Sequence, residues 1–337
     1  MFRRCLTLIF FISAISKPVW AEGIAPPKPD QSNFVVNEAS VGQAARALGF
    51  ISGQTLSLKA IAHQHPDLAR AAEKLRVTFD AAYGFPELRA KWFLDHAIGK
   101  EKADSAAEDI RGQGHDAVQS VQKADALAFL EEVDARLEGR LDDTVLKAML
   151  WLRYGDQPSL EMREWWQQFS SAGHPKAAGM DIWMRAPFSW RQEEGDRPHI
   201  VSKWTSQNGT GDMVITLLVR ELPGSVTYED VLAVEKEQNW DWLLADGFEF
   251  LGGSAIELDR QPGLQVDARG ERRILDVSLM QRTRVYTLFP PDRFVQLGCM
   301  LGGKSGADEV IYGRRFEAMK EICRQVALKV TFPDTYR

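Results

Sequence analysis

The hydrophobic pattern of this chain changes its period near Gly173-His174-Pro175. Before that point, from Glu38 to about Ser171, Ala, Leu, Glu, Lys and Arg dominate and β-branched residues are sparse, which is typical of helices. From Met180 onward, short apolar runs alternate with Gly, Pro and Asp, as in strands joined by turns. We therefore expect an α+β protein: an N-terminal helical bundle followed by an antiparallel sheet flanked by helices.

The first half predicts a bundle of five or six helices. Helical apolar spacing over Ser57–Phe79 is interrupted by Pro66, which breaks or kinks a helix. The charged segment Lys100–Asp116 is expected to be a loop or a frayed helix. Leu160–Phe169, which carries a Trp pair, is expected to be the last helix of the bundle.

The second half predicts strands interrupted by two helices, at about Tyr228–Ala245 and Ala307–Leu328. Phe248–Leu251 and Ala255–Asp259 are expected to be separate strands. Most gaps between the strands are too short for a parallel crossover. The connections should therefore be tight and antiparallel.

Four segments of the second half form a recognisable order: Met180–Trp190 (MDIWMRAPFSW), the hairpin His199–Ser206 with Asp212–Glu221, the helix after it, and the Cys299 strand with its helix. This order resembles the PsbP-like fold of photosystem II extrinsic subunits and of bacterial exported proteins. The resemblance covers roughly residues 177–335. It implies an α/β/α sandwich used mainly for binding and assembly, with no catalytic motif shared by the family.

The helical half separately resembles bacterial exported proteins of no known activity, through Gly53-Gln54 and Pro66-Asp67-Leu68. The predicted organisation is a signal peptide at 1–21, a linker at 22–37, a helical domain at 38–172 and a PsbP-like domain at 177–335. The linker carries three prolines and few apolar residues, so it should be extended and mobile.

The first residues predict export. Arg3 and Arg4 precede a short apolar run from Leu6 to Ile15, and Val19-Trp20-Ala21 fits a small-x-small cleavage site. The run is too short to cross a bilayer, which needs about 20 apolar residues. We expect cleavage after Ala21 and a periplasmic or secreted protein; the alternative is an N-terminal anchor that stays attached.

The charge of the chain argues against a nucleic-acid partner. Lys and Arg number 41 against 47 Asp and Glu, a formal net charge of −6. The leader holds basic residues and no acidic one, so its removal leaves the mature chain more acidic. An acidic protein gains no counterion release from a phosphate backbone. No later stretch is apolar and long enough to span a membrane.

Cys299 and Cys323 are the two cysteines beyond the leader. Each lies in an apolar pattern, one on an expected strand and the other on an expected helix. A bridge between them is available in an oxidising compartment and could contribute ~3 kcal/mol. Two buried unpaired thiols are the alternative. Catalysis by either cysteine is disfavoured, because no His flanks them.

The titratable residues do not form a convincing catalytic or metal-binding set. In a helix the residues of His63-x-His65 diverge by about 200°, and neighbours in sequence point in different directions. We therefore expect no catalytic residue, no metal and no cofactor from the pairs that stand out, which are His63-x-His65, Asp95-His96 and His115-Asp116.

Four tryptophans are candidates for a binding surface: Trp165, Trp166, Trp240 and Trp242. Neighbours on a helix cannot all face one core, so some of these rings must be exposed or lie at an interface. Aromatic side chains are enriched at binding surfaces. An interface between the two domains is the alternative.

These observations favour an exported binding or assembly factor of the cell envelope without catalytic activity. Its partner would be an envelope protein or a glycan. The alternative is an envelope hydrolase acting on cell-wall or carbohydrate material, supported by the number of Trp residues and by scattered Asp, Glu and His.

Overall fold

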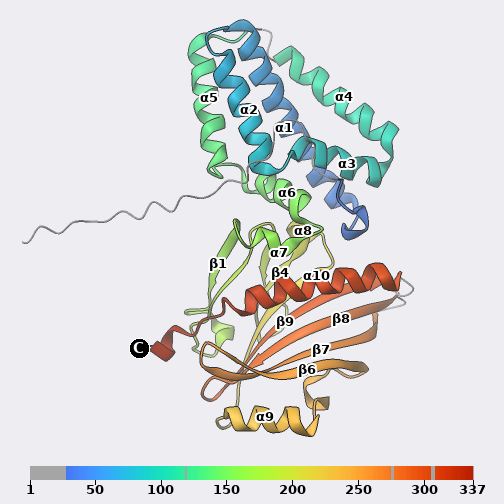
Figure 1. Cartoon of the computed structure of the whole chain (residues 1–337), viewed down its shortest axis with the longest axis vertical. Helices are drawn as coiled ribbons and strands as arrows, with labels where there is room; N and C mark the ends of the chain where they lie inside the picture. Colours follow the sequence, from blue (N-terminus) through green and yellow to red (C-terminus); the bar gives the residue numbers. More distant parts are fainter. Residues whose placement is uncertain (1–27, 118–119, 275–276, 305–307, 337) are drawn as a thin grey trace, which may run out of the picture.

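The computed structural model describes residues 28–117, 120–274, 277–304 and 308–336. The predicted signal peptide lies outside these residues. The first half of the chain is helical and occupies the upper end of the molecule in Figure 1. Its helices are α1 (Glu38–Gln64), α2 (Ala69–Tyr83), α3 (Pro86–Ile98), α4 (Lys100–Ala117), α5 (Lys123–Leu137), α6 (Asp143–Tyr154) and the short α7 (Pro158–Glu161).

Local signals set several of these helix ends. Asn37 and Ser40 form a capping box at the start of α1, and the helix stops just before Pro66. Gly84, at φ 67°, ends α2 in the left-handed conformation. The predicted break at Pro66 is thus confirmed.

The charged segment after Gly99 differs from the expected loop, because it forms the helix α4. Its small residues Ala103 and Ala107 are buried, at 1% and 3% exposure, against the rest of the bundle. Tertiary packing of one alanine face therefore stabilises a helix whose composition is otherwise strongly charged.

The expected helix Leu160–Phe169 is wrong. The helical turn α7 ends at Glu161, and Trp166–Ser170 forms strand β1, which pairs antiparallel with β2 (Trp183–Pro187). Phe169 lies opposite Met184 in this ladder, and both are buried. Pairing with a strand that follows later in the sequence overrides the local helical preference.

The remaining strands form one antiparallel sheet in the order β3-β4-β5-β9-β8-β7-β6. Phe248–Leu258 is one strand, β6, and not the two strands expected, because pairing with β7 continues through a register shift between Phe250 and Gly252. The other strands are β3 (Arg191–Glu194), β4 (Ile200–Thr205), β5 (Met213–Glu221), β7 (Gln261–Ile274), β8 (Val277–Leu288) and β9 (Arg293–Lys304).

Helices lie on both faces of the sheet (Figure 1), which makes the second half an α+β sandwich. The long helix α10 (Glu309–Ala327) covers one face, where alternate residues of β5 are fully buried. On the other face α9 (Tyr228–Glu237) packs over β6 and β7. The helix α9 is shorter than the expected Tyr228–Ala245, since Gln238 adopts the left-handed conformation and ends it.

The described part of the predicted linker, residues 28–37, packs against the rest of the chain. The ring of Phe34 lies 5.8 Å from that of Phe93 in the helical core. Next to it, the backbone N–H of Val35 donates to Oε1 of Gln207 at 2.8 Å, in the turn after β4. Residues 28–37 therefore contact both halves, and the domain limits 38–172 and 177–335 stay a prediction.

Candidate ligand groove on the open face of the sheet

A groove of about 850 Å³ lies on the face of the sheet that α10 does not cover. Its volume falls in the range of small-molecule sites, roughly 300–1,000 Å³. The floor comes from the outward-facing residues of β5, β9, β8 and β7. These strands alternate, with one residue buried under α10 and the next turned to the groove.

Strand register sets the floor of the groove in rows. Thr216 pairs with Gly298, and Gly298 pairs in turn with Val285 of β8. Gly298, at the centre of this row, adds no side chain to the floor. A Cβ at this position would lie only 2.9 Å from the hydroxyl of Thr216. The next row along the strands includes Val214 and Met300.

Two different walls border the floor. The segment after α9 supplies Trp242, Leu243 and Leu244, which are apolar. Opposite them, the β3–β4 turn and the start of β4 supply polar and charged residues, among them Arg197 and His199. The wall after α9 is therefore apolar as far as Asp246, and the opposite wall is charged.

The charged wall meets the floor at a small basic cluster, which we define as Arg197, His199 and Arg220. A guanidinium N–H of Arg220 donates to Nε2 of His199 at 2.8 Å. Burial, together with the charges of Arg220 and Arg197, lowers the pKa of His199 below its usual value. Among the described residues no Asp or Glu forms an ion pair with either arginine, whereas nearby Lys203 pairs with Asp196 at 3.5 Å.

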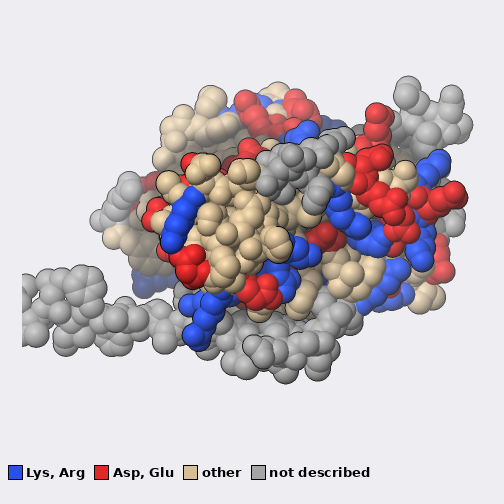
Figure 2. Space-filling model, turned by 90° about the horizontal axis from the view of Figure 1, so that it is seen from above, with Lys and Arg blue, Asp and Glu red and all other residues tan. Residues whose placement is uncertain are grey.

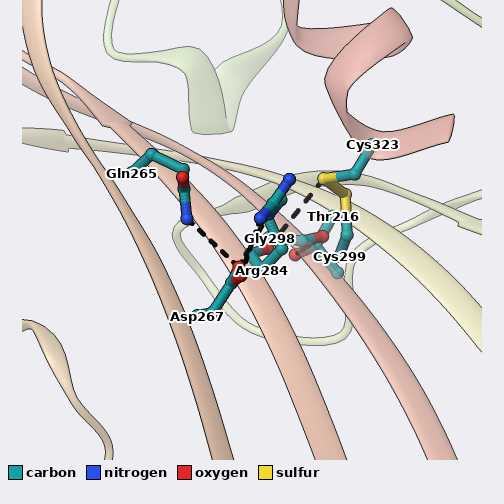
Figure 3. Close-up of a disulfide and its surroundings, with 7 residues drawn as sticks. All are labelled: Thr216, Gln265, Asp267, Arg284, Gly298, Cys299 and Cys323. Carbon is teal, nitrogen blue, oxygen red and sulfur yellow. Dashed lines mark hydrogen bonds and ion pairs between the residues drawn. A yellow bond between two sulfur atoms is a disulfide. The ribbon is translucent and has the colours of Figure 1, made fainter. Parts of the chain in front are cut away.

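The disulfide lies on the opposite side of the floor. Cys299 of β9 is bonded to Cys323 of α10, with a Cα–Cα distance of 6.1 Å, as the sequence predicted. Close to it, Asp267 accepts two hydrogen bonds from Arg284, at 2.7 and 2.6 Å (Figure 3). The bridge thus holds α10 against the strand that carries the centre of the groove floor.

The four candidate tryptophans do not lie on one surface. Trp165 is partly buried between the two halves, 6.4 Å from the ring of Phe188, and Trp166 is exposed on β1. Trp240 is buried at 2% exposure, and only Trp242, at 51%, borders the groove.

The histidine pairs found in the sequence lie away from the groove. His63 is exposed, and His65 is hydrogen-bonded through Nε2 to the carbonyl of Val121 at 2.8 Å. His96 is exposed on α3, and the side chain of His115 lies outside the described residues. Within the described part of the chain, no group of His, Cys, Asp and Glu could hold a metal ion.

Sequence reasoning missed His199 and Arg220 as functional candidates. They are far apart in the sequence and meet because the backbone of Val219 pairs with that of His199. The available signal was the hairpin itself: once β4 and β5 are paired, residues near the open end of the hairpin lie side by side.

A buried carboxyl group lies at the junction of the two halves. Glu161, at 1% exposure, accepts hydrogen bonds from the backbone N–H and the hydroxyl of Ser189, at 2.6 and 2.7 Å. Burial raises its pKa to about 7. The two hydrogen bonds to Ser189 give this carboxyl a structural role in joining α7 to the turn after β2.

The solved structures similar to this chain include a cyanobacterial and a mycobacterial protein. Cyanobacterial PsbP (CyanoP) from Synechocystis sp. PCC 6803 is 13% identical with a TM-score of 0.32, and the match covers 50% of this chain and 92% of that one. LpqN, involved in cell envelope biogenesis of Mycobacterium tuberculosis, is 14% identical with a TM-score of 0.31, covering 51% and 94%.

The matched half of the chain is similar to PsbP-like proteins. At these identities the likeness concerns the fold alone. No family model matches the sequence, and no curated protein matches it either.

The helical end of the molecule shows charges of both signs (Figure 2). Lys and Arg alternate with Asp and Glu around an uncharged centre on this face. Among the described residues, no helix combines the length and the apolar character needed to cross a bilayer.

Proposed function

We propose that this chain is an exported binding protein of the cell envelope that holds a ligand in the groove on the open face of its sheet. The observation that carries the proposal is the groove itself, a space of about 850 Å³ floored by half-buried residues and bordered by a basic cluster. The predicted leader and the disulfide support an oxidising compartment.

In this proposal the two halves have different roles. The sheet half binds the ligand on a floor that α10 and the disulfide hold rigid. The helical half and its exposed surface provide the contact for an envelope partner, a protein or a glycan. Binding by the groove and contact by the bundle together describe a binding or assembly factor.

The groove offers less support for the alternative of an envelope hydrolase. A hydrolase of this kind needs a histidine that faces a nucleophile. In the groove, Nε2 of His199 instead accepts a hydrogen bond from the guanidinium group of Arg220. We therefore favour a binding role.

A blocking substitution tests the groove. Val285 lies half-buried in the middle of the floor, so Val285→Trp should fill the space while keeping a residue that strands accept. The matched control is Val310→Trp, because Val310 is 76% exposed at the start of α10 and outside the groove.

The assay is mass spectrometry of small molecules that the purified protein retains after incubation with a bacterial envelope extract. We expect the wild type and Val310→Trp to retain the same compound and Val285→Trp to lose it. Retention of nothing by the wild type, or equal retention by all three folded proteins, contradicts the proposal.

A further inference from the structure

We propose that the ligand of this groove is a single-chain amphiphile with an acidic head group, a carboxylate or a phosphate monoester. The head lies at the basic cluster of Arg197, His199 and Arg220, and the chain follows the floor. This inference rests on the proposed function, because it assumes that the groove binds a ligand.

The head-group position follows from the chemistry of the cluster. Nε2 of His199 accepts from Arg220, so the ring is neutral and its Nδ1 carries a proton that it can donate. The guanidinium groups of Arg197 and Arg220 border the groove without a carboxylate partner among the described residues. Two guanidinium groups and an imidazole N–H match the acceptors of a carboxylate or a phosphate.

The chain position follows from the floor. Leu218, Val266, Val285 and Met300 present aliphatic side chains to the groove. Leu243 and Leu244 add apolar surface from the wall after α9. Such a surface favours an alkyl chain, because each CH₂ group that it removes from water adds to the binding free energy.

Two polar side chains of the floor, those of Thr216 and Gln296, are used within the protein. The hydroxyl of Thr216 donates to the carbonyl of Gly298 at 3.3 Å. The amide of Gln296 donates to the hydroxyl of Thr287 at 3.4 Å. A sugar ring over this part of the floor would find the hydroxyl of Thr216 and the amide of Gln296 already engaged, and this favours an alkyl chain over a glycan.

Length and charge fix the direction of the ligand. On β9 the floor runs from Phe294, which pairs with Arg220, to Met300, a distance of about 20 Å at the rise of an antiparallel strand. Asp246 and Glu271 border the other end of the groove. Carboxylates there repel a second acid, so the acidic head belongs at the basic cluster.

The first test compares head groups on one chain length. Isothermal titration calorimetry of the full mature protein uses laurate, lauryl phosphate, lauryl alcohol and lauryltrimethylammonium, each below its micellar concentration. We expect laurate and lauryl phosphate to bind at least tenfold more tightly than the alcohol and the ammonium compound to bind weakest. Equal affinity for laurate and the alcohol overturns the head-group assignment.

The second test separates the amphiphile from its parts. Acetate and inorganic phosphate should not bind measurably, and vesicles of phosphatidylglycerol should not retain the protein. If acetate or phosphate competes as well as laurate, the cluster is a site for free anions. If the vesicles bind the protein and laurate does not, the surface recognises a membrane. Either result overturns the proposal.

Paired variants locate the two ends of the ligand. Arg197→Gln with Arg220→Gln should weaken laurate at least tenfold and leave lauryl alcohol unchanged, while Val285→Trp should weaken both. The charge-matched control is Arg140→Gln with Arg324→Gln, two arginines paired at the surface away from the groove, which should leave both ligands unaffected. If the affinity for laurate is the same in the Arg197 and Arg220 variant as in the wild type, the proposal is wrong.

Failure of this inference is distinguishable from failure of the proposed function. If an envelope compound is retained by the wild type and lost in Val285→Trp, but no lauryl compound binds, the groove binds a ligand of another class. If neither an envelope compound nor a lauryl compound depends on Val285, the groove is not a binding site and both proposals are wrong.

Discussion

At the residue scale, two tryptophans separated by one position have opposite environments. Trp240 is 2% exposed and stacks on Phe250 with ring centroids 5.4 Å apart, whereas Trp242 is 51% exposed. Trp240→Ala should therefore lower the free energy of unfolding by about 3–5 kcal/mol, and Trp242→Ala by less than about 1 kcal/mol. Urea unfolding of both variants measures the difference; equal losses would contradict the difference in burial between the two rings.

Glu161 predicts a pH-dependent stability. Its pKa is raised from 4.5 to about 7 in the folded protein, so folding favours the protonated form. The stability that this provides is complete below about pH 4.5 and is lost as the pH rises through 7, a change of about 3 kcal/mol at most.

Glu161→Gln isolates the pH dependence of stability that Glu161 contributes. The amide does not titrate, and it can still hydrogen-bond to the backbone N–H and the hydroxyl of Ser189. We expect the variant to gain stability relative to the wild type between pH 5 and 8, measured by urea unfolding at each pH. A constant difference over this range would show that Glu161 does not titrate there.

At the element scale, the disulfide fastens a helix to the sheet. It joins β9 and α10 across a separation of 24 residues and closes a loop for which chain entropy predicts a contribution of about 3 kcal/mol. Cys299→Ala with Cys323→Ala should lower the free energy of unfolding by about that amount, measured by urea unfolding. Reduction of the wild type should give a similar loss, and no loss in either case would rule out a stabilising bridge.

Elements with strong local signals were predicted well, and elements formed by pairing were not. Pro66 and the alternation in β5 are local features, so the break between α1 and α2 and the strand itself were recognised. Strand β1 forms because it pairs with β2, and β6 is continuous because its pairing with β7 continues past Gly252. The residues that stabilise each of these strands are therefore in another part of the sequence.

At the scale of the whole molecule, the compartment is the property to test first. N-terminal sequencing of the native protein should give Glu22 as the first residue. Thiol labelling of the protein unfolded in denaturant without reductant should leave Cys299 and Cys323 unmodified, because both are fully buried in the folded protein. A native protein that begins at Met1, lies in the cytosol and labels at both cysteines would remove the basis of the envelope role.

The sequence alone determined the helical and strand-forming halves, the predicted leader and the bridge between Cys299 and Cys323, because these depend on local periodicity and composition. Only the tertiary structure decided where the groove lies and which residues border it. Periodicity shows which face of a strand is apolar, but it does not show what covers that face. Helix α10 covers one face of β5 fully, whereas α9 covers the other face of the sheet only in part, and helix packing thus leaves the groove floor open. Strand pairing brings His199 within hydrogen-bond distance of Arg220.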